Sequence, residues 1–396
     1  MKYRTDPKSG NQLSVLGFGC MRFPRGINAK IDIDKTEKLI MSAIAGGVDY
    51  FDTGYIYGGS EQALGEVFGR NKGVRGKIYI ATKLPVAKCK DGGDFDRIFN
   101  TQLERLNTGY IDYYLMHNLS SARQWDSLCE MGIREWIAKK KAEGSLRRIG
   151  FSFHGAQNEF LILIDAYEWD FCQIQYNYMN ENYQAGKKGL LKAYEKGMPV
   201  IIMEPLLGGK LAAGLPKKAV KFIKNSGVGL TPAALALRWI WNQKETTVVL
   251  SGMSAPEQLS ENIAAAETAE ADMLTETETE LVERVAAVIK GAYKIPCTGC
   301  NYCQPCSHGV NISGCFAGYN ALFSSGYITG MAQYVTSTGA TNPGKNQGAR
   351  NCVKCGKCER LCPQNIKIIK SLEAVSRRME PVWYNAAIKL IGRILN

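Results

Sequence analysis

Short apolar runs alternate with longer amphipathic stretches along the first 270 residues of the chain. Runs of five to seven mostly apolar residues predict strands, and the stretches between them have the periodicity of helices. Residues 34–45, 61–68 and 94–106 are examples of the predicted helices. The eight predicted strands are residues 14–19, 48–52, 78–83, 111–117, 147–151, 171–175, 200–204 and 247–251.

Eight strands, each followed by a helix, indicate an α/β fold of the (β/α)8 TIM-barrel type rather than a doubly wound sheet. A doubly wound dinucleotide-binding domain would carry a G-x-G-x-x-G turn after its first strand. The chain has Gly17-Phe18-Gly19 at that point and lacks the third glycine. We therefore predict a barrel over residues 1–272.

The rest of the chain predicts helices without alternating strands. Residues 273–294 have one amphipathic pattern with Thr275 as a candidate N-cap, and residues 312–324 and 328–335 also read as helical. We expect the last amphipathic helix to pack against protein rather than to dock on a membrane surface. The predicted divisions after the barrel are a connecting helix over 273–294, a small, mostly helical domain over 295–375 and a basic amphipathic helix over 376–396.

Eight cysteines in two short runs are the strongest chemical signal of this second domain. The runs read C-x2-C-x2-C-x2-C and C-x2-C-x2-C-x3-C-P. Such runs hold 4Fe–4S clusters, and in two-cluster ferredoxins the fourth cysteine of each run binds the other run's cluster. Zinc sites use hooks separated by a loop, and disulfides between cysteines packed this densely would be strained. We expect one cluster on Cys297, Cys300, Cys303 and Cys362 and a second on Cys352, Cys355, Cys358 and Cys306.

The net charge of the chain is informative only for this second domain, where it is concentrated. The whole chain carries a formal +12, and residues 291–396 contain twelve Lys and Arg against three acidic residues, a net charge of +9. Two oxidised clusters with their thiolates would reduce this to about +5. The remaining excess suits an acidic electron carrier such as a ferredoxin or flavodoxin, and no basic–aromatic motif for nucleic acid occurs. Thiolate ligands and the lack of a signal sequence or long apolar run predict a cytoplasmic protein.

Polar residues stand where three consecutive strands of the predicted barrel end. Asp52 ends the second strand, Lys83 the third and His117 the fourth, and Tyr57 follows Asp52 by five residues. The carboxyl ends of barrel strands meet at the face that carries the chemistry. Each residue alone could be structural. Together they outline a carbonyl-reducing site, with a phenol to donate a proton, a cation held by a carboxylate, and an imidazole to orient the carbonyl.

These residues and the segments around them resemble the aldo-keto reductase family, in particular its branch with a C-terminal two-cluster 4Fe–4S domain. The resemblance covers almost the whole barrel, residues 10–270. The matching segments are LGFGCMRFP (16–24), FDTGYIYGGSE (51–61), ATK (81–83), DYYLMHN (112–118), GFS (150–152), QIQYN (173–177), EPLLGGKL (204–211) and SAPEQLSENI (254–263).

This resemblance implies a role for each residue at the strand ends. Tyr57 would be the general acid, with Lys83 and Asp52 paired to favour its ionised form, and His117 would position the substrate carbonyl. The hydride would come from NADH or NADPH. In the family, residues at the positions of Ser152 and Gln173 bind the nicotinamide carboxamide, and those of Glu261 and Asn262 contact the adenine.

Three positions depart from the family pattern, all near the expected nucleotide site. Met203 stands where an aromatic residue often stacks on the nicotinamide, and Phe153 where an asparagine usually follows the serine. Gln258 stands where NADPH-preferring members place an arginine. A clamp for the adenosine 2′-phosphate needs a guanidinium or an ammonium, so the sequence leaves NADH and NADPH open.

We therefore expect an oxidoreductase that interconverts a small carbonyl compound and its alcohol with NAD(P)H and carries two 4Fe–4S clusters. The alternative is an iron–sulfur electron-transfer protein whose barrel binds a partner or another redox cofactor, such as a flavin, and performs no aldo-keto chemistry. The three departures favour this alternative, and the four intact residues at the strand ends weigh against it. A link between the two-electron hydride and one-electron clusters does not follow from the motifs.

Overall fold

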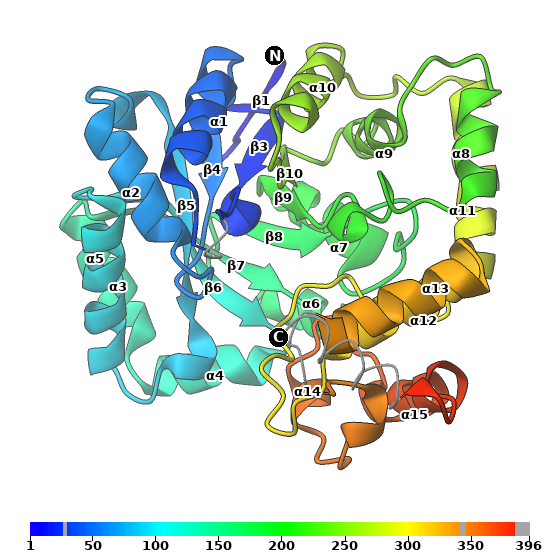
Figure 1. Cartoon of the computed structure of the whole chain (residues 1–396). Coiled ribbons are helices and arrows are strands. Elements are labelled where there is room, and N and C mark those ends of the chain that lie inside the picture. The colour runs from blue at the N-terminus through cyan, green and yellow to red at the C-terminus, as the bar shows by residue number, and fades with distance from the viewer. Residues whose placement is uncertain (27–29, 341–345, 385–396) are drawn as a thin grey trace. The chain divides into compact units, whose positions relative to one another are not determined.

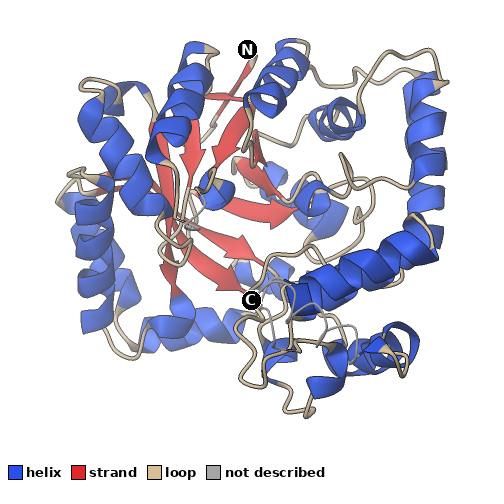
Figure 2. Cartoon of the chain, viewed as in Figure 1, coloured by secondary structure: helices blue, strands red, loops and turns tan. Residues whose placement is uncertain are grey.

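Eight parallel strands close into a barrel, with helices around it (Figures 1 and 2). The computed structural model describes residues 1–26, 30–340 and 346–384. Around the barrel the order is β10-β3-β4-β5-β6-β7-β8-β9, and every pair of neighbours is parallel. All eight predicted strands are present, so the TIM-barrel prediction is confirmed. They are β3 (Leu16–Gly19), β4 (Tyr50–Asp52), β5 (Tyr79–Pro85), β6 (Ile111–Leu119), β7 (Leu146–Phe153), β8 (Phe171–Gln175), β9 (Val200–Met203) and β10 (Val248–Ser251).

Helices connect the strands, as the amphipathic stretches predict. The segments predicted at 34–45, 61–68 and 94–106 are the first three of them. The helices of the barrel are α1 (Ile33–Ala45), α2 (Ser60–Arg70), α3 (Gly93–Leu106), α4 (Ala122–Glu130), α5 (Ile133–Ala142), α6 (Gln157–Leu163), α7 (Gly186–Glu195), α9 (Pro232–Trp241) and α10 (Pro256–Glu267).

A two-stranded antiparallel hairpin precedes the barrel and was not predicted. It consists of β1 (Tyr3–Thr5) and β2 (Gln12–Ser14), each too short to show a periodicity. Leu13 of the hairpin packs in the barrel interior with Tyr113, whose hydroxyl donates a hydrogen bond to the buried Asp6 carboxylate at 2.9 Å. Because Tyr113 lies near the start of β6, the hairpin closes the amino-terminal end of the barrel. The carboxyl ends of the strands are left for chemistry.

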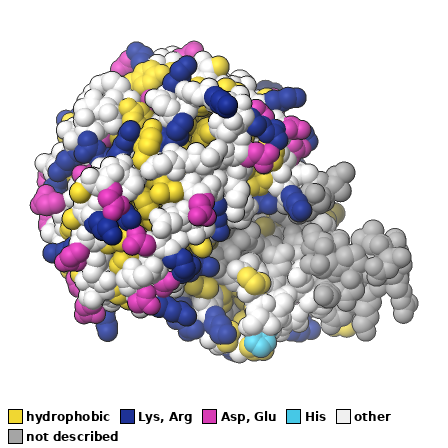
Figure 3. All heavy atoms as spheres, turned by 90° about the vertical axis from the view of Figure 1, so that its left-hand side faces the viewer, with side chains coloured by type: hydrophobic (Ala, Val, Ile, Leu, Met, Phe, Trp, Pro, Cys, Tyr) yellow, Lys and Arg dark blue, Asp and Glu magenta, His cyan; other side chains and the backbone are white. Residues whose placement is uncertain are grey.

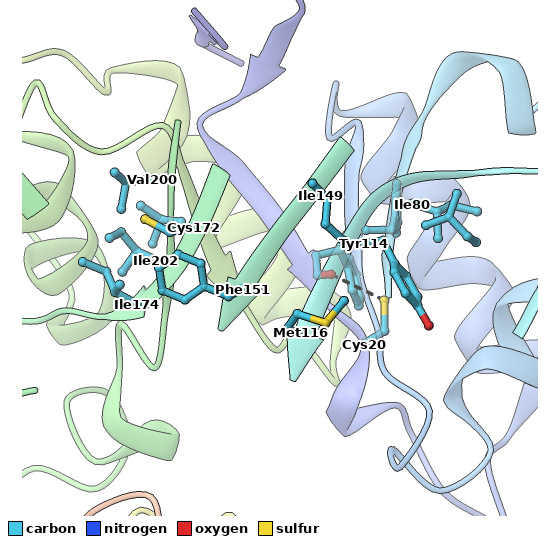
Figure 4. Close-up of a cluster of buried hydrophobic side chains, with 14 of the residues drawn as sticks. Cys20, Ile80, Tyr114, Met116, Ile149, Phe151, Cys172, Ile174, Val200 and Ile202 are labelled. Atoms are coloured by element: carbon cyan, nitrogen blue, oxygen red, sulfur yellow. Dashed lines mark hydrogen bonds between the residues drawn. The ribbon is translucent and has the colours of Figure 1, made fainter. Parts of the chain in front are cut away.

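Alternating residues of the strands build two separate apolar layers. Tyr113 and Leu115 of β6 pack inside the barrel, whereas Tyr114 and Met116 belong to the larger layer between strands and helices. Figure 4 shows part of this outer layer, in which Phe151 of β7 lies among residues of the neighbouring strands. This alternation follows from the two-residue period of a strand. It allows polar residues on the inner face to sit at the open end without disturbing the outer layer.

Contacts within the chain define a second compact unit besides the barrel. The barrel unit contains Met1–Leu206 and Ala233–Leu274, and the second unit contains Leu207–Pro232 and the chain from Thr275 onward. The segment 207–232, which the predicted boundaries assign to the barrel, thus belongs to the second unit by its contacts. The helices of the second unit are α8 (Lys217–Lys224), α11 (Glu276–Ala292), α12 (Ile312–Ser324), α13 (Tyr327–Val335), α14 (Lys357–Arg360) and α15 (Ile368–Met379).

Three helices predicted for this unit are present. The helix over 273–294 is α11, and Thr275 caps it: its hydroxyl accepts from Glu278 N at 3.2 Å, and the Glu278 carboxylate accepts from Thr275 N at 2.9 Å. The helix predicted at 312–324 is α12, and the one at 328–335 is α13. Of the amphipathic helix predicted at the C-terminus, residues 385–396 lie outside the described part of the chain. The domain boundaries themselves stay predictions.

The surface and the helices carry two further observations. No helix among residues 1–26, 30–340 and 346–384 is long and apolar enough to cross a membrane. On the face that turns α2, α3 and α5 toward the viewer, basic and acidic side chains are interspersed (Figure 3). This mixture agrees with the near balance of charges in the barrel part of the sequence.

Candidate active site and cluster sites

A buried ion pair joins two neighbouring strands at the open end of the barrel. Asp52 is the last residue of β4, and Lys83 lies on β5 two residues beyond Ala81, the register partner of Asp52. The Lys83 Nζ atom is 2.6 Å from Asp52 Oδ1 and 2.5 Å from the carbonyl oxygen of Thr53. Both side chains are almost completely buried. Burial raises the pKa of Asp52, whereas Lys83 and a hydrogen bond from Gln173 lower it.

Tyr57 lies over this pair. It stands in the loop between β4 and α2, where its backbone N–H donates to Gly54 O at 2.9 Å and closes a turn. The Lys83 Nζ atom is 4.9 Å from the centroid of the Tyr57 ring, and the His117 ring meets it edge-on with centroids 5.8 Å apart. The side chain is only half-buried. The four residues expected at the strand ends are therefore brought together.

His117 is placed by an irregularity of β6. The register with β7 shifts between Met116 and Leu119, and Asn118 has a φ of 63°, a left-handed value that is uncommon outside glycine. Bulges next to active sites re-aim a side chain in this way. Burial, together with the charge of Lys83, lowers the pKa of His117 well below its usual value. The imidazole is thus neutral at pH 7 and keeps one N–H donor.

A second buried histidine lies close enough to influence the first, and the sequence reasoning missed it. His154 follows β7, its backbone N–H donates to Leu119 O at 2.8 Å, and its charge would lower the pKa of His117. Its Nδ1 lies 3.2 Å from Gln184 Oε1, within hydrogen-bond distance. Only three histidines occur in the chain, and one directly after the GFSF segment was a signal that could have been used.

His154 should make the stability of the barrel pH-dependent. Burial lowers its pKa to about 4 from the ordinary 6.5. A buried base with a lowered folded-state pKa binds its proton more weakly in the folded chain than in the unfolded chain. The fold keeps its full stability above the unfolded pKa and loses stability as the pH falls from there toward 4. Between pH 8 and pH 5 we expect wild type to lose about 2 kcal/mol more than His154→Asn. Urea unfolding at both pH values measures this, and an equal loss in both proteins would contradict it.

Ser152 and Gln173 stand opposite each other on β7 and β8. The Ser152 hydroxyl accepts from Asn118 N at 2.8 Å, so its own proton remains to be donated. Gln173 Nε2 donates to Asp52 Oδ2 at 3.1 Å, which turns its Oε1 away from the carboxylate. That buried oxygen has no hydrogen-bond partner among the described residues. A hydroxyl donor beside an unsatisfied amide acceptor fits a carboxamide such as that of a nicotinamide.

The expected adenine contacts lie on α10. Asn262 is buried, and its amide donates to Ser251 Oγ at 2.9 Å, while Glu261 is half-buried. Gln258, at the position expected for a phosphate-binding arginine, accepts from Ser254 N at 2.8 Å. Phe153 is fully buried and packs against Phe160. The departures at Phe153 and Gln258 therefore have local structural roles.

The two cysteine runs interleave in the second unit. Burial and, beyond that, the neighbouring thiols of Cys297, Cys300 and Cys362 raise the pKa of Cys303 to about 12. Cys362 of the second run therefore lies with three cysteines of the first, as the expected pairing requires.

The other four cysteines, Cys306, Cys352, Cys355 and Cys358, line one cavity of about 170 Å³, which Cys303 of the first run also lines. No three His, Cys, Asp or Glu side chains within 1–26, 30–340 and 346–384 converge tightly enough to bind a single metal ion. A 4Fe–4S cluster spreads four thiolates over four irons, so all-sulfur sets of this kind fit it.

Comparison with known proteins agrees with both halves of this description. The family model described as aldo/keto reductase family matches residues 15–283, and one described as 4Fe-4S dicluster domain matches residues 296–367. The chain is 29% identical to the L-galactose dehydrogenase of Arabidopsis thaliana over 287 residues, which cover 65% of this chain and 85% of the relative. It is 25% identical to the NADH-specific methylglyoxal reductase of Escherichia coli over 306 residues, covering 64% and 90%.

Solved structures support the same fold. An aldo-keto reductase from Bacillus halodurans in its holo form superposes with a TM-score of 0.60 at 23% identity, covering 72% of this chain and 96% of that one. An aldo-keto reductase from Klebsiella pneumoniae in complex with NADPH gives 0.58 at 20% identity, covering 72% and 95%. Because the first family model spans more than half of the sequence, this chain belongs to the aldo/keto reductase family, and its C-terminal part carries a 4Fe–4S dicluster domain.

Proposed function

We propose that this oxidoreductase interconverts a small carbonyl compound and its alcohol with NADH or NADPH, with Tyr57 as the general acid, and that it holds two 4Fe–4S clusters. The observation that carries the catalytic part is the placement of Tyr57 over the buried Lys83–Asp52 pair, with a neutral His117 at the edge of its ring. A phenol whose ring lies beside a cation is suited to lose its proton, because the cation stabilises the phenolate that remains.

Each residue of the site then has a stated task in carbonyl reduction. The bound nicotinamide supplies the hydride. His117 donates its N–H to the carbonyl oxygen and orients the substrate, and Tyr57 delivers its proton to that oxygen as negative charge develops there. The Lys83 ammonium stabilises the Tyr57 phenolate, and Asp52 holds Lys83 in place through the ion pair at 2.6 Å. In alcohol oxidation the same groups act in reverse.

The Asp52 carboxylate belongs both to the catalytic pair and to the proposed nucleotide site. Ser152 would donate to the carbonyl oxygen of the nicotinamide amide, and the unsatisfied Gln173 Oε1 would accept from its nitrogen. Gln173 is held in place by Asp52. Glu261 and Asn262 would contact the adenine. Since Gln258 offers no positive charge to a 2′-phosphate, we propose that NADH is accepted at least as well as NADPH. The relative named as an NADH-specific reductase is consistent with this choice.

In the second unit, Cys297, Cys300, Cys303 and Cys362 would hold one cluster, and Cys306, Cys352, Cys355 and Cys358 the other. Two 4Fe–4S clusters predict about eight iron and eight acid-labile sulfide atoms per chain. A value near four of each would show that one of the two sites stays empty.

An anaerobic titration tests the proposal as a whole. The protein is mixed with NADH or NADPH and then with a panel of small aldehydes, ketones and 2-oxoaldehydes, while nicotinamide and cluster absorbance are followed together. We expect carbonyl-dependent oxidation of the nucleotide. Bleaching of the clusters by the nucleotide alone would show that the barrel and the clusters exchange electrons. Intact clusters without any carbonyl-dependent oxidation would favour an iron–sulfur electron-transfer protein instead.

A further inference from the structure

One of the eight cluster cysteines is much more accessible than the others. Cys355 is exposed, whereas the remaining seven are half-buried. Cys303 of the other set also lines the 170 Å³ cavity, in which Cys355 lies with its proposed co-ligands Cys306, Cys352 and Cys358. We propose that the surface around Cys355 is the docking site of an acidic one-electron carrier protein, which exchanges electrons with the cluster on these four cysteines. The proposal rests on the proposed function in so far as that cluster must be present.

The centre of this surface is apolar. Val353 and Leu361 are 56% and 50% exposed, and both line the same cavity as Cys355. A single exposed apolar side chain needs no explanation, but two of them beside one exposed ligand form a small water-excluding contact. Electron-transfer encounters typically bury less than about 1,200 Å² in total, so a patch of this size is enough for a transient partner.

The rim of the surface is basic. Lys354, Lys357 and Arg360 surround Cys355 in sequence, and all three are exposed. Lys354 pairs with Glu373 at 2.6 Å, whereas neither Lys357 nor Arg360 has an ion-pair partner in the described part of the chain. Of the two acidic groups within residues 350–378, Glu359 accepts from Ile369 N, and Glu373 is the partner of Lys354. Residues 350–378 contain eight Lys and Arg against these two acidic residues, and an oxidised cluster with four thiolates would add about −2. The net charge of this segment therefore stays positive, at about +4, which attracts a partner with an acidic face.

The chemistry of the cluster decides the class of the partner. A 4Fe–4S cluster exchanges one electron, whereas a nicotinamide passes two as a hydride, so the direct partner must be a one-electron carrier. In the step itself the reduced carrier loses one electron and the oxidised cluster gains it. No bond forms or breaks and no proton moves. An anionic membrane would also meet a basic and apolar surface, but it gives no reason for the exposed thiolate at its centre.

The test measures how fast an acidic ferredoxin reduces the cluster. Photoreduced ferredoxin is mixed anaerobically with the full-length protein, and the second-order rate of cluster bleaching is recorded at several salt concentrations. At low salt we expect Lys357→Glu/Arg360→Glu to be slower than wild type by about 10- to 100-fold. The difference should nearly vanish at 1 M salt, where the Debye length is about 3 Å.

A matched control carries the same change of charge elsewhere in the second unit. Lys217 and Lys218 are exposed at the start of α8, which packs against α11. Lys217→Glu/Lys218→Glu should keep the wild-type rate within about twofold, since these charges lie outside the docking surface. Leu361→Ser is a second test that leaves the charge unchanged: it should weaken the complex without altering the salt dependence.

The outcomes separate this proposal from the proposed function. Wild-type protein without iron and sulfide would overturn both. Clusters and carbonyl reduction with equal ferredoxin rates in wild type and Lys357→Glu/Arg360→Glu would overturn the docking site alone. Loss of binding to vesicles containing phosphatidylserine, with an unchanged ferredoxin rate, would identify a membrane surface and likewise overturn it. A selective, salt-dependent loss in Lys357→Glu/Arg360→Glu supports it.

Discussion

Tyr57→Phe is expected to lower kcat/KM for carbonyl reduction by about 10²- to 10⁴-fold, because the variant has no phenolic proton to donate. The ring remains, so its edge contact with His117 and its position over Lys83 are kept. Ser152 and Gln173, which would hold the nicotinamide, are untouched. The Kd for NADH should therefore change little, and the loss should appear in kcat.

Steady-state kinetics together with fluorescence titration of NADH separate these two effects. Tyr110→Phe is a matched control that removes a hydroxyl just before β6, at the opposite end of that strand from His117, where Arg75 and Arg147 lie over the Tyr110 ring. It should keep wild-type activity. If Tyr57→Phe retained activity within about tenfold of wild type, another group would be the proton donor, and the role of Tyr57 in the proposed function would be wrong.

The sequence predicted that these residues lie close together, because they mark the ends of strands. Asp52, Lys83 and His117 each follow an apolar run, and a closed parallel barrel necessarily brings such ends to one face. The α/β barrel, the strand positions and the helix α11 with its cap at Thr275 are visible in the same patterns, since they depend on local periodicity and capping. The spacing of the two cysteine runs is by itself enough to predict ligands of 4Fe–4S clusters.

The structural features that the sequence did not predict depend on long-range packing. The β1–β2 hairpin consists of three-residue strands that gain their partners only at the closed end of the barrel. The shift of register at His117 and the left-handed conformation of Asn118 arise where β6 pairs with β7, and no residue type in this segment predicts them. The pairing of Gln184 with His154 joins two loops, and the hydrogen bond from Gln173 to Asp52 joins strands far apart in the sequence. These contacts hold the side chains of His154 and Gln173 in position, so they matter for the chemistry.

Lys83→Met is expected to destabilise the barrel by about 3–5 kcal/mol at pH 8, because it leaves the buried Asp52 carboxylate without its cation. Lys83→Met/Asp52→Asn removes both charges and should recover part of this loss, which measures the coupling between the two residues. Both variants should lose most carbonyl-reducing activity, since neither has an ammonium beside Tyr57. Urea unfolding followed by tryptophan fluorescence reports on the barrel, because Trp125, Trp169 and Trp241 are buried there.

The pH dependence of this loss identifies its cause. Burial raises the pKa of Asp52 and Lys83 lowers it, so removal of Lys83 leaves burial less opposed and the folded-state pKa rises further. A carboxyl group with a raised folded-state pKa destabilises the fold above its unfolded pKa, and this penalty is relieved as the pH falls through the folded value. The deficit of Lys83→Met relative to wild type should therefore shrink from pH 8 toward pH 5, whereas Lys83→Met/Asp52→Asn, which has no carboxyl group to protonate at this position, should show no such recovery. If the loss of stability did not change with pH in either variant, the hydrogen bond from Gln173 would be enough to stabilise the Asp52 carboxylate. The role of Asp52 would then be to hold Gln173 for the nucleotide rather than to pair with Lys83.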